Sequence, residues 1–572
     1  MAFVWSFILY ATLCARAASA QDAGGRQSEA PAAQTQNSGQ GTQSASQPAS
    51  YSPQRTSATV QQTPAPPQQQ AARPIYIQEY RVIGAHKLSP EEVEDAVYPF
   101  LGPGRTADDV EQARAALEQA YQAKGYQTIS VQIPPQQVRG GVVVLQVVEG
   151  TVGRLRVHGA RYFLPEQIKK AAPSLAEGTV PDFNKVAKDI VGLNQLADLR
   201  VTPTLRAGEL PNTVDVDLNV KDTLPLHGSL ELNNRYSPDT LPLRINGVIS
   251  YNNLWQLGHS IGFSFQVAPQ NLNDAEVFSA YYLLRIPSLN WLSLILQGTK
   301  QDSNVSTLGG TDVVGRNQSA GLQAVIALPP GKNFFHSVSV GINYKHNDQG
   351  FNLGTGKVET PITYYPISAT YSATLLWKGT ETDLNAGVTF NFRGMGSAEA
   401  EFDNSRFDAT GSFIYLRGDL SETIDLPLGF QAFGKVQGQV ADQPLVNSEQ
   451  FGGGGLTTAR GYLEAEELGD NAIFGSLEFR SPSLVSYLPW NWVHGKGNDW
   501  RVYTFVDAGE LTNWDTLPDQ ISRFNLASYG FGSRLKIEDH LNGSIDTGVP
   551  VIGSTYTAFH EVRVIFRLWA EF

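Results

Sequence analysis

Cysteine is nearly absent from this sequence. Among 572 residues Cys14 is the single cysteine, and it lies in an apolar N-terminal stretch. If that stretch is removed, the remaining chain can form no disulfide framework, no cysteine-based metal site and no thiol nucleophile. These classes of structure and chemistry are therefore excluded for the mature protein.

Long apolar runs and an excess of basic residues are also lacking. Beyond residue 20 no stretch reaches the roughly 18 uninterrupted apolar residues of a membrane-spanning helix. The formal net charge is −13, from 42 Lys and Arg against 55 Asp and Glu. Because affinity for phosphates comes from clustered basic side chains, no nucleic-acid partner is expected.

Motifs of enzyme active sites are missing as well. The nine histidines show no H-E-x-x-H or paired metal-ligand spacing, and there is no G-x-S-x-G. The glycines at 452–455 lack the Lys and Ser or Thr that follow in a phosphate-binding loop. Glu464, Glu466 and Glu467 are expected to form a solvated acidic loop rather than a catalytic carboxylate site. We therefore expect no enzymatic activity, no catalytic residue, no cofactor and no bound metal.

The N-terminal region predicts export. Residues 1–20 predict a secretory signal peptide, because an apolar run is followed by the small residues Ala18, Ser19 and Ala20. A membrane-anchoring helix is the alternative, but the run is shorter than the ~20 residues that span a bilayer. Residues 21–73 are rich in Gln, Ser and Pro, which predicts a disordered linker.

A small module with the order β-α-α-β-β is predicted at 74–149. Ser89 is a helix N-cap followed by Pro90, and a second helix begins after Thr106 and ends at Gly125. The apolar stripe of this second helix contains Val110, Ala113, Leu117 and Tyr121.

The module is followed by a second copy, predicted at 150–222. The segment 81–85 (RVIGA) matches 156–160 (RVHGA) at a separation of 75 positions, which indicates an internal duplication. The two modules resemble POTRA domains, the periplasmic units that precede certain outer-membrane barrels. Their exposed sheet edges can accept an extended peptide by strand addition. The alternative is that they only space the barrel from something else.

Residues 223–572 predict a β-barrel. Two-residue alternation is frequent, as where Leu384, Ala386 and Val388 alternate with Asn385 and Gly387. Such strands suit a wall with one face in lipid and the other toward a polar lumen, and the length accommodates about 16 strands. A soluble sandwich or propeller would give similar alternation.

The C-terminal strand favours the membrane barrel. In the segment 561–572, Phe566, Leu568 and Phe572 share one face, and Arg563 and Arg567 share the other. This arrangement resembles the C-terminal signal by which outer-membrane barrels are recognised for insertion.

A glycine-rich stretch at 451–470 predicts a loop folded back into the barrel. Four successive glycines are not expected inside a strand or helix. They are followed by Ala459, Arg460, Gly461 and Tyr462. In the segment 502–509 (VYTFVDAG), Phe505, Asp507 and Gly509 share a face opposite an apolar one, so Asp507 is expected to point into the lumen. A guanidinium binds a carboxylate in a bidentate manner, which makes Arg460 its expected partner. The alternative is that Arg460 is a solvated loop cation and Asp507 an acid near a turn.

With these motifs, the sequence resembles the TpsB transporters of two-partner secretion, the ShlB/FhaC/HecB branch of the BamA superfamily. Three features carry the resemblance, which covers roughly 75–572: the two POTRA-like modules, the ARGY motif and the F-x-D-x-G motif. The family usually has Val where this chain has Ala459. Family members often carry an N-terminal plug helix, but the residues after Gln21 have no amphipathic periodicity.

The resemblance implies an outer-membrane translocator with periplasmic POTRA domains that performs type Vb secretion. Such a protein captures a partner exoprotein, an adhesin, a cytolysin or a toxin, and exports it unfolded through the barrel. Outer-membrane lipids and the barrel-assembly machinery are its other implied partners. Two alternatives stay open at this point, a BamA-like factor that assembles outer-membrane proteins and a passive diffusion porin.

Overall fold

The computed structural model describes residues 74–138, 140–286, 289, 291–306, 313–352, 357–487, 497–518, 520–538 and 540–572. The predicted signal peptide, the linker and the region of a plug helix lie outside these ranges. Among the residues described, no helix has the length and apolar character needed to cross a membrane.

The first unit is a small α+β fold. Its elements are β1 (Ile75–Ile77), β2 (Glu79–Ile83), α2 (Pro90–Val97), β3 (Gly102–Arg105), α3 (Ala107–Ala123), β4 (Ile129–Gln132) and β5 (Val142–Glu149). Ser89 caps α2 with its side chain, and the predicted stripe of α3 is buried against the sheet, which confirms both predictions. The expected first strand is divided into β1 and β2, which pair with different neighbours.

The second unit repeats the sheet of the first. It contains β6 (Thr151–His158), α4 (Pro165–Lys170), α5 (Phe183–Asn194), β7 (Leu199–Ala207) and β8 (Thr213–Asp222). The strand orders β2-β5-β4 and β6-β8-β7 each combine one parallel and one antiparallel pair. The domain boundaries proposed from the sequence fall between these elements.

A glycine recurs at the same place in both units. Gly84 has φ +85° and Gly159 has φ +88°, and these residues are matched positions of the sequence repeat. A Cβ at Gly84 would lie 2.6 Å from the carbonyl oxygen of Val147, and one at Gly159 would lie closer still to that of Val220. Both copies therefore need a residue without a side chain at this turn.

The barrel is closed and antiparallel. Its strands are β9 (Leu226–Asn233), β10 (Arg244–Leu254), β11 (His259–Val267), β12 (Ala275–Arg285), β13 (Leu292–Ser306), β14 (Val313–Ala327), β15 (Phe334–Asn352), β16 (Lys357–Tyr364), β17 (Ile367–Trp377), β18 (Thr380–Phe390), β19 (Ile414–Asp425), β20 (Gln431–Ala441), β23 (Asn471–Arg480), β24 (Asp499–Thr512), β25 (Arg523–Ile537), β26 (Leu541–Pro550) and β27 (Arg563–Glu571).

The wall contains 16 strands, as the sequence predicts. The elements β16 and β17 pair in succession with the two halves of β15, so together they count as one strand. They are separated near Pro366, which has no N–H to donate to the ladder. The pairing of β27 with β9 closes the cylinder.

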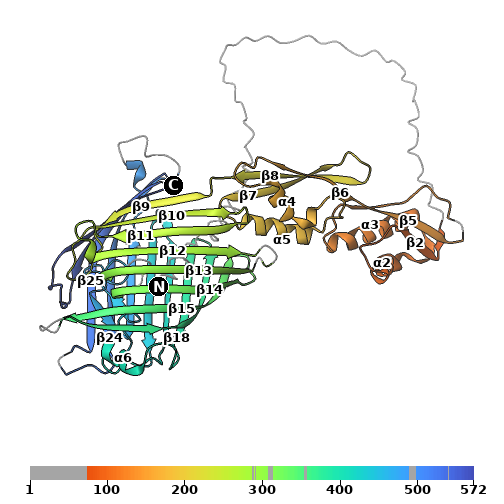
Figure 1. Ribbon diagram of the computed structural model, residues 1–572. Coiled ribbons are helices and arrows are strands. Elements are labelled where there is room, and N and C mark those ends of the chain that lie inside the picture. The colour runs from red at the N-terminus through yellow and green to blue at the C-terminus, as the bar shows by residue number, and fades with distance from the viewer. Residues whose placement is uncertain are drawn as a thin grey trace, which may run out of the picture.

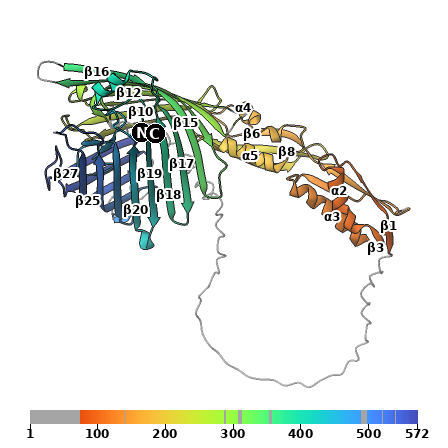
Figure 2. The ribbon, with the colours of Figure 1, turned by 90° about the horizontal axis from the view of Figure 1, so that it is seen from below.

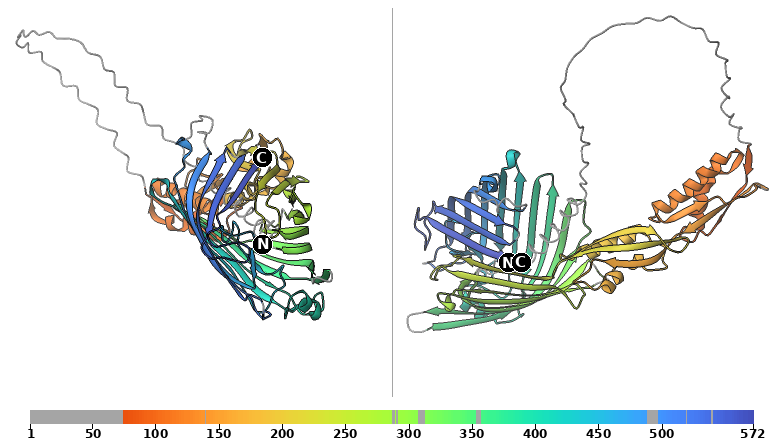
Figure 3. Two further views of the ribbon diagram at one scale, coloured as in Figure 1. Left: turned by 90° about the vertical axis from the view of Figure 1, so that its left-hand side faces the viewer. Right: turned by 90° about the horizontal axis from the view of Figure 1, so that it is seen from above.

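The two units project from one end of the barrel, which we call the near rim; the opposite end is the far rim (Figures 1 and 2). Hydrogen bonds join the second unit to this rim: the Gln256 side chain, in the turn between β10 and β11, donates to the Tyr162 carbonyl at 3.1 Å and accepts from the Leu164 N–H at 3.0 Å. Figure 3 shows the same arrangement from two further sides. The connection between β20 and β23 lies at the far rim.

Candidate functional site

The connection between β20 and β23 forms the site. It comprises residues 442–470, here called the inserted loop, and contains the short paired strands β21 (Phe451–Gly453) and β22 (Glu467–Gly469). The prediction that the glycine run avoids strands is wrong for Gly452 and Gly453. A Cβ at Gly453 would lie 2.6 Å from Leu511 Cδ1 and 2.8 Å from Phe474 Cζ, so glycine lets this hairpin lie directly against the wall.

Arg460 lies at the tip of the inserted loop and is 3% exposed. Its Nε and Nη2 each donate to a different carboxylate oxygen of Asp507, both at 2.8 Å, and its backbone N–H donates to Asp507 at 3.0 Å. The structure thus brings together the two residues that the sequence pairs. Ser476 Oγ, 2.7 Å from Asp507 Oδ1, adds a hydrogen bond to the same carboxylate.

Further charged groups on the inner wall complete the surroundings of Arg460. Its Nη1 donates to Glu478 Oε1 at 2.5 Å and lies 3.6 Å from Asp546 Oδ1. Glu478 also pairs with Arg480 at 2.7 Å and Arg534 at 3.0 Å. Three carboxylates and three guanidinium groups therefore balance in one cluster, in which each charge has a partner and only the Arg534 side chain is well exposed. Sequence reasoning identified Asp507 and missed Glu478 and Asp546.

The F-x-D-x-G motif on β24 supplies an aromatic surface as well as a charge. The guanidinium of Arg460 lies 3.6 Å from the ring centroid of Phe505, a cation–π contact. On the neighbouring strand, a Cβ at Gly530 would lie 2.6 Å from Phe505 Cζ, and one at Gly509 would collide with the Phe474 ring. The small residues therefore make room for the aromatic rings beneath the loop.

The residues beside Arg460 fit tightly against β25 and β26. Ala459 and Tyr462 are fully buried. The Tyr462 hydroxyl donates to the Ile552 carbonyl at 2.7 Å and accepts from the Ala527 N–H at 3.0 Å. The Gly461 N–H donates to Ser528 Oγ at 3.2 Å. The whole ARGY motif is thus held by the wall.

The expectation of a solvated acidic loop is wrong. Glu464, Glu466 and Glu467 are all buried, because neighbouring connections supply their partners. Glu464 forms a bidentate pair with Arg235, at 2.6 and 3.2 Å. Hydroxyl groups from the connection between β26 and β27 donate to the other two, Thr557 to Glu466 and Thr555 to Glu467, both at 2.6 Å.

A second attachment of the inserted loop to the wall was not predicted. Glu449 of the inserted loop accepts from Lys345 at 2.5 Å, from the Tyr364 hydroxyl at 2.6 Å and from the Tyr415 hydroxyl at 2.8 Å. These partners belong to β15, β16 and β19, whereas Arg460 binds β23 and β24. The inserted loop is therefore fixed to two separate regions of the wall.

The residues of the predicted C-terminal signal lie at the seam that closes the barrel. Leu568 and Phe572 are exposed on the outer face, and Phe566 accepts a hydrogen bond from Asn234 through its carbonyl. Phe572 exchanges backbone hydrogen bonds with Gly228 at 3.0 and 3.2 Å, and its ring lies where a Cβ of Gly228 would be.

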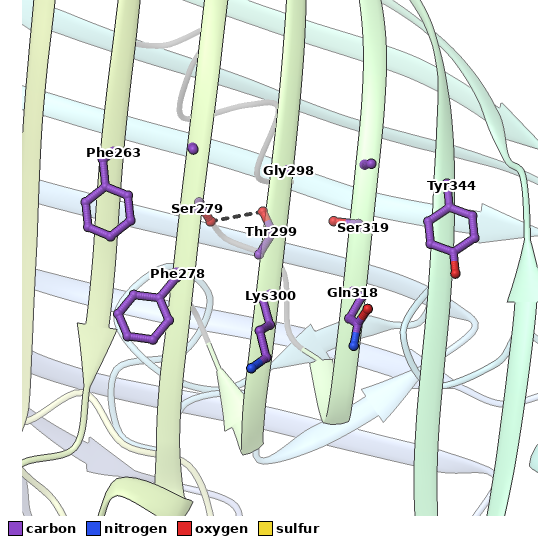
Figure 4. A pocket seen from close by; sticks show the side chains of 11 residues that line it. Phe263, Phe278, Ser279, Gly298, Thr299, Lys300, Gln318, Ser319 and Tyr344 are labelled. Carbon is purple, nitrogen blue, oxygen red and sulfur yellow. Dashed lines mark hydrogen bonds between the residues drawn. The ribbon is translucent and has the colours of Figure 1, made fainter.

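A hollow of about 430 Å³ lies on the barrel wall and involves none of the predicted site residues (Figure 4). A row of cross-strand partners forms its floor, where Ala280, Gly298 and Ala320 lie between the rings of Phe263 and Tyr344. This row shares the exposed outer face with the leucines of β13 and β14. The hollow thus faces outward and is separate from the lumen.

Sequence comparison identifies two regions of the chain. A family model described as haemolysin secretion/activation protein ShlB/FhaC/HecB matches residues 212–535, more than half of the chain. A second, described as POTRA domain, ShlB-type, matches residues 75–150.

Similar curated proteins are transporters. The outer membrane transporter CdiB of Escherichia coli O6:K15:H31 is 23% identical over 523 residues, covering 86% of this chain and 81% of that protein. The CdiB of Dickeya dadantii is 22% identical over 411 residues, or 66% of each chain. The heme/hemopexin transporter protein HuxB of Haemophilus influenzae is 20% identical over 410 residues, or 70% of each chain.

Solved structures with the same fold include CdiB from Escherichia coli, with a TM-score of 0.62 at 20% identity over 89% of this chain and 93% of that one. BamA from Haemophilus ducreyi, lacking POTRA domains 1–3, gives a TM-score of 0.53 at 14% identity over 87% and 100%. At these identities the likeness concerns the fold.

Proposed function

Because the chain belongs to the ShlB/FhaC/HecB family of haemolysin secretion/activation proteins, the outer-membrane translocators of two-partner secretion, we propose that it captures one exoprotein and exports it unfolded through the barrel. The barrel lies in the outer membrane and the POTRA domains lie in the periplasm. The near rim is accordingly periplasmic, and the inserted loop reaches the lumen from the cell surface.

Capture begins at the POTRA sheets. In the strand orders β2-β5-β4 and β6-β8-β7, the edge strands β2 and β6 contain no proline, whereas β7 contains Pro203 and β4 is closely followed by Pro134 and Pro135. Proline weakens an edge as a site for strand addition. An extended segment of the exoprotein therefore adds to β2 or β6 through main-chain hydrogen bonds. The exoprotein is an adhesin, a cytolysin or a toxin.

Passage requires the inserted loop to move. The loop is attached to the inner wall at two separate places, through Arg460 and through Glu449, so it occupies space that a polypeptide must cross. When the tip is displaced, Arg460 loses its contacts with the wall and binds water or groups of the passing chain instead. Folding of the exported protein outside the cell supplies the driving force. The barrel-assembly machinery inserts the barrel among outer-membrane lipids.

The observation that carries this proposal is the buried bidentate pair between Arg460 and Asp507. In Arg460→Ala, the barrel should still insert, while secretion of the partner falls at least about tenfold, because a buried carboxylate without its cation costs ~3–5 kcal/mol. Immunoblots of membrane and culture medium measure the two quantities.

The matched control is Arg523→Ala, since Arg523 is an exposed residue paired with Glu510 on the same part of the barrel. Secretion should stay near the wild-type level in this variant. Normal secretion in Arg460→Ala would reject the functional role of the pair.

A further inference from the structure

Asp470 is the most completely buried carboxylate of the inserted loop. It immediately precedes β23, at the point where the loop rejoins the wall, and its exposed fraction is 0%. The contacts of Arg460 and Glu449 do not include it. A buried charge at this position must be compensated by partners from neighbouring segments.

Three extracellular connections meet at this carboxylate. Arg406, between β18 and β19, donates from Nη1 at 2.5 Å and from Nη2 at 2.7 Å. The N–H groups of Leu445, at the start of the inserted loop, and Trp514, between β24 and β25, donate at 2.9 Å. Gln450 Nε2 adds a contact at 3.2 Å. The bidentate geometry fixes orientation as well as distance.

The connection that carries Arg406 is packed into the barrel mouth. Its helix α6 (Glu399–Ser405) lies at the far rim (Figure 1). Phe402 is buried with its ring centroid 5.8 Å from that of Tyr364 on β16. The same apolar cluster contains Leu445 and Val446 of the inserted loop. Arg406 is 14% exposed at its side chain, so its pair with Asp470 lies at the edge of this packed layer.

We propose that Arg406 and Asp470 form an extracellular clamp that fastens the β18–β19 connection to the base of the inserted loop. The clamp is separate from the Arg460 contact, since it lies at the mouth rather than on the inner wall. Arg406 is a positioning residue that acts through Asp470. That the clamp opens when a polypeptide leaves the barrel rests on the proposed function.

The clamp itself is tested by ion conductance, which needs no exported partner. In planar lipid bilayers, the purified full-length protein with Arg406→Ala should show open events at least about tenfold more often than wild type, because one partner of a buried pair is lost. Arg406→Lys keeps the charge but lacks the planar guanidinium that binds both carboxylate oxygens, so its frequency of open events should lie between those of Arg406→Ala and wild type. Arg523→Ala should match wild type. Unchanged open events in Arg406→Ala, with the barrel inserted, would overturn the clamp.

A reversible tether tests whether the clamp must open. Thr410 and Gln443 lie on the same two connections, with Gln443 Nε2 donating to Thr410 Oγ1 at 2.8 Å. The chain has no cysteine other than Cys14, so T410C/Q443C can be joined selectively with a reducible thiol cross-linker.

Export should stop in the tethered protein and return on reduction, while the separate single-cysteine variants export normally after the same treatment. Export that continues in the tethered protein would overturn the requirement for opening. If wild type exports no partner at all, the proposed function fails, whereas the conductance result still decides the clamp.

Discussion

Gly461 shows why the tip of the inserted loop depends on more than charge. A Cβ at this residue would lie 2.7 Å from Ser528 Cβ and 3.0 Å from the backbone nitrogen of Pro550. Backbone atoms of β26 cannot move aside as the end of a flexible side chain would. The missing side chain thus allows Arg460 to reach Asp507.

Gly461→Ala is therefore expected to reduce export, although less strongly than Arg460→Ala and with every charge retained. Overpacking of this kind typically costs ~1–3 kcal/mol. Secreted partner, normalised to barrel in the membrane, is the measurement.

Gly543→Ala is the control for this variant, because a Cβ at Gly543 on the same strand β26 would meet only atoms 3.8 Å away. Its export should stay at the wild-type level. Equal export from Gly461→Ala and Gly543→Ala would refute the argument that the loop tip needs a residue without a side chain at 461.

At the residue scale, the sequence predicted the partners that belong to local patterns. Alternation in β24 placed Asp507 toward the lumen, and the small residues around Arg460 indicated a close approach. It did not predict that Glu464, Glu466 and Glu467 are buried. Their partners come from connections about 90 or more than 200 positions away, and local patterns do not contain such pairings.

The edge strands of the two POTRA units allow the capture step to be tested at the scale of single elements. Ile83 on the edge strand β2 is an apolar side chain that is 53% exposed. An extended segment added to β2 would pass beside it.

A photo-cross-linking amino acid at position 83 should therefore form an adduct with the exoprotein during export. The control position is 210, in the turn after β7, where Leu210 is 69% exposed. The same amino acid there should form at least about fivefold less adduct, because strand addition occurs along an edge. Comparable adducts at both positions would favour the view that the units are spacers.

The secondary-structure elements were the part of this structure that the sequence predicted best. Strand alternation predicts the barrel, and the repeat of 75 positions predicts two similar units, whose matched turns both require glycine. The pairing of β21 with β22 escaped prediction, because four glycines have unfavourable propensity for a strand. Packing of Gly453 against Leu511 and Phe474 outweighs that propensity here.

At the scale of the whole molecule, sidedness follows from the path of the chain. Both POTRA units adjoin the near rim (Figure 1). The inserted loop, which connects β20 to β23, enters from the far rim. Under the proposed function, substrate is thus met on one side of the membrane and released on the other. An assembly factor for membrane barrels would instead serve many clients from the periplasmic side.

Deleting the gene should therefore remove one large exoprotein from the medium and leave the set of outer-membrane barrels unchanged. Quantitative proteomics of both fractions measures this, with the gene restored on a plasmid as the control. A general loss of membrane barrels would point to the assembly factor instead.

The charge cluster around Arg460 has an electrical consequence. While the tip is seated, Asp507, Glu478 and Asp546 are matched by Arg460, Arg480 and Arg534. Once the tip withdraws, one arginine leaves and this patch of wall carries an excess negative charge. Lysine-rich stretches of a translocating polypeptide would then be drawn along it and acidic stretches repelled. With the tip withdrawn, the barrel should therefore conduct potassium more readily than chloride.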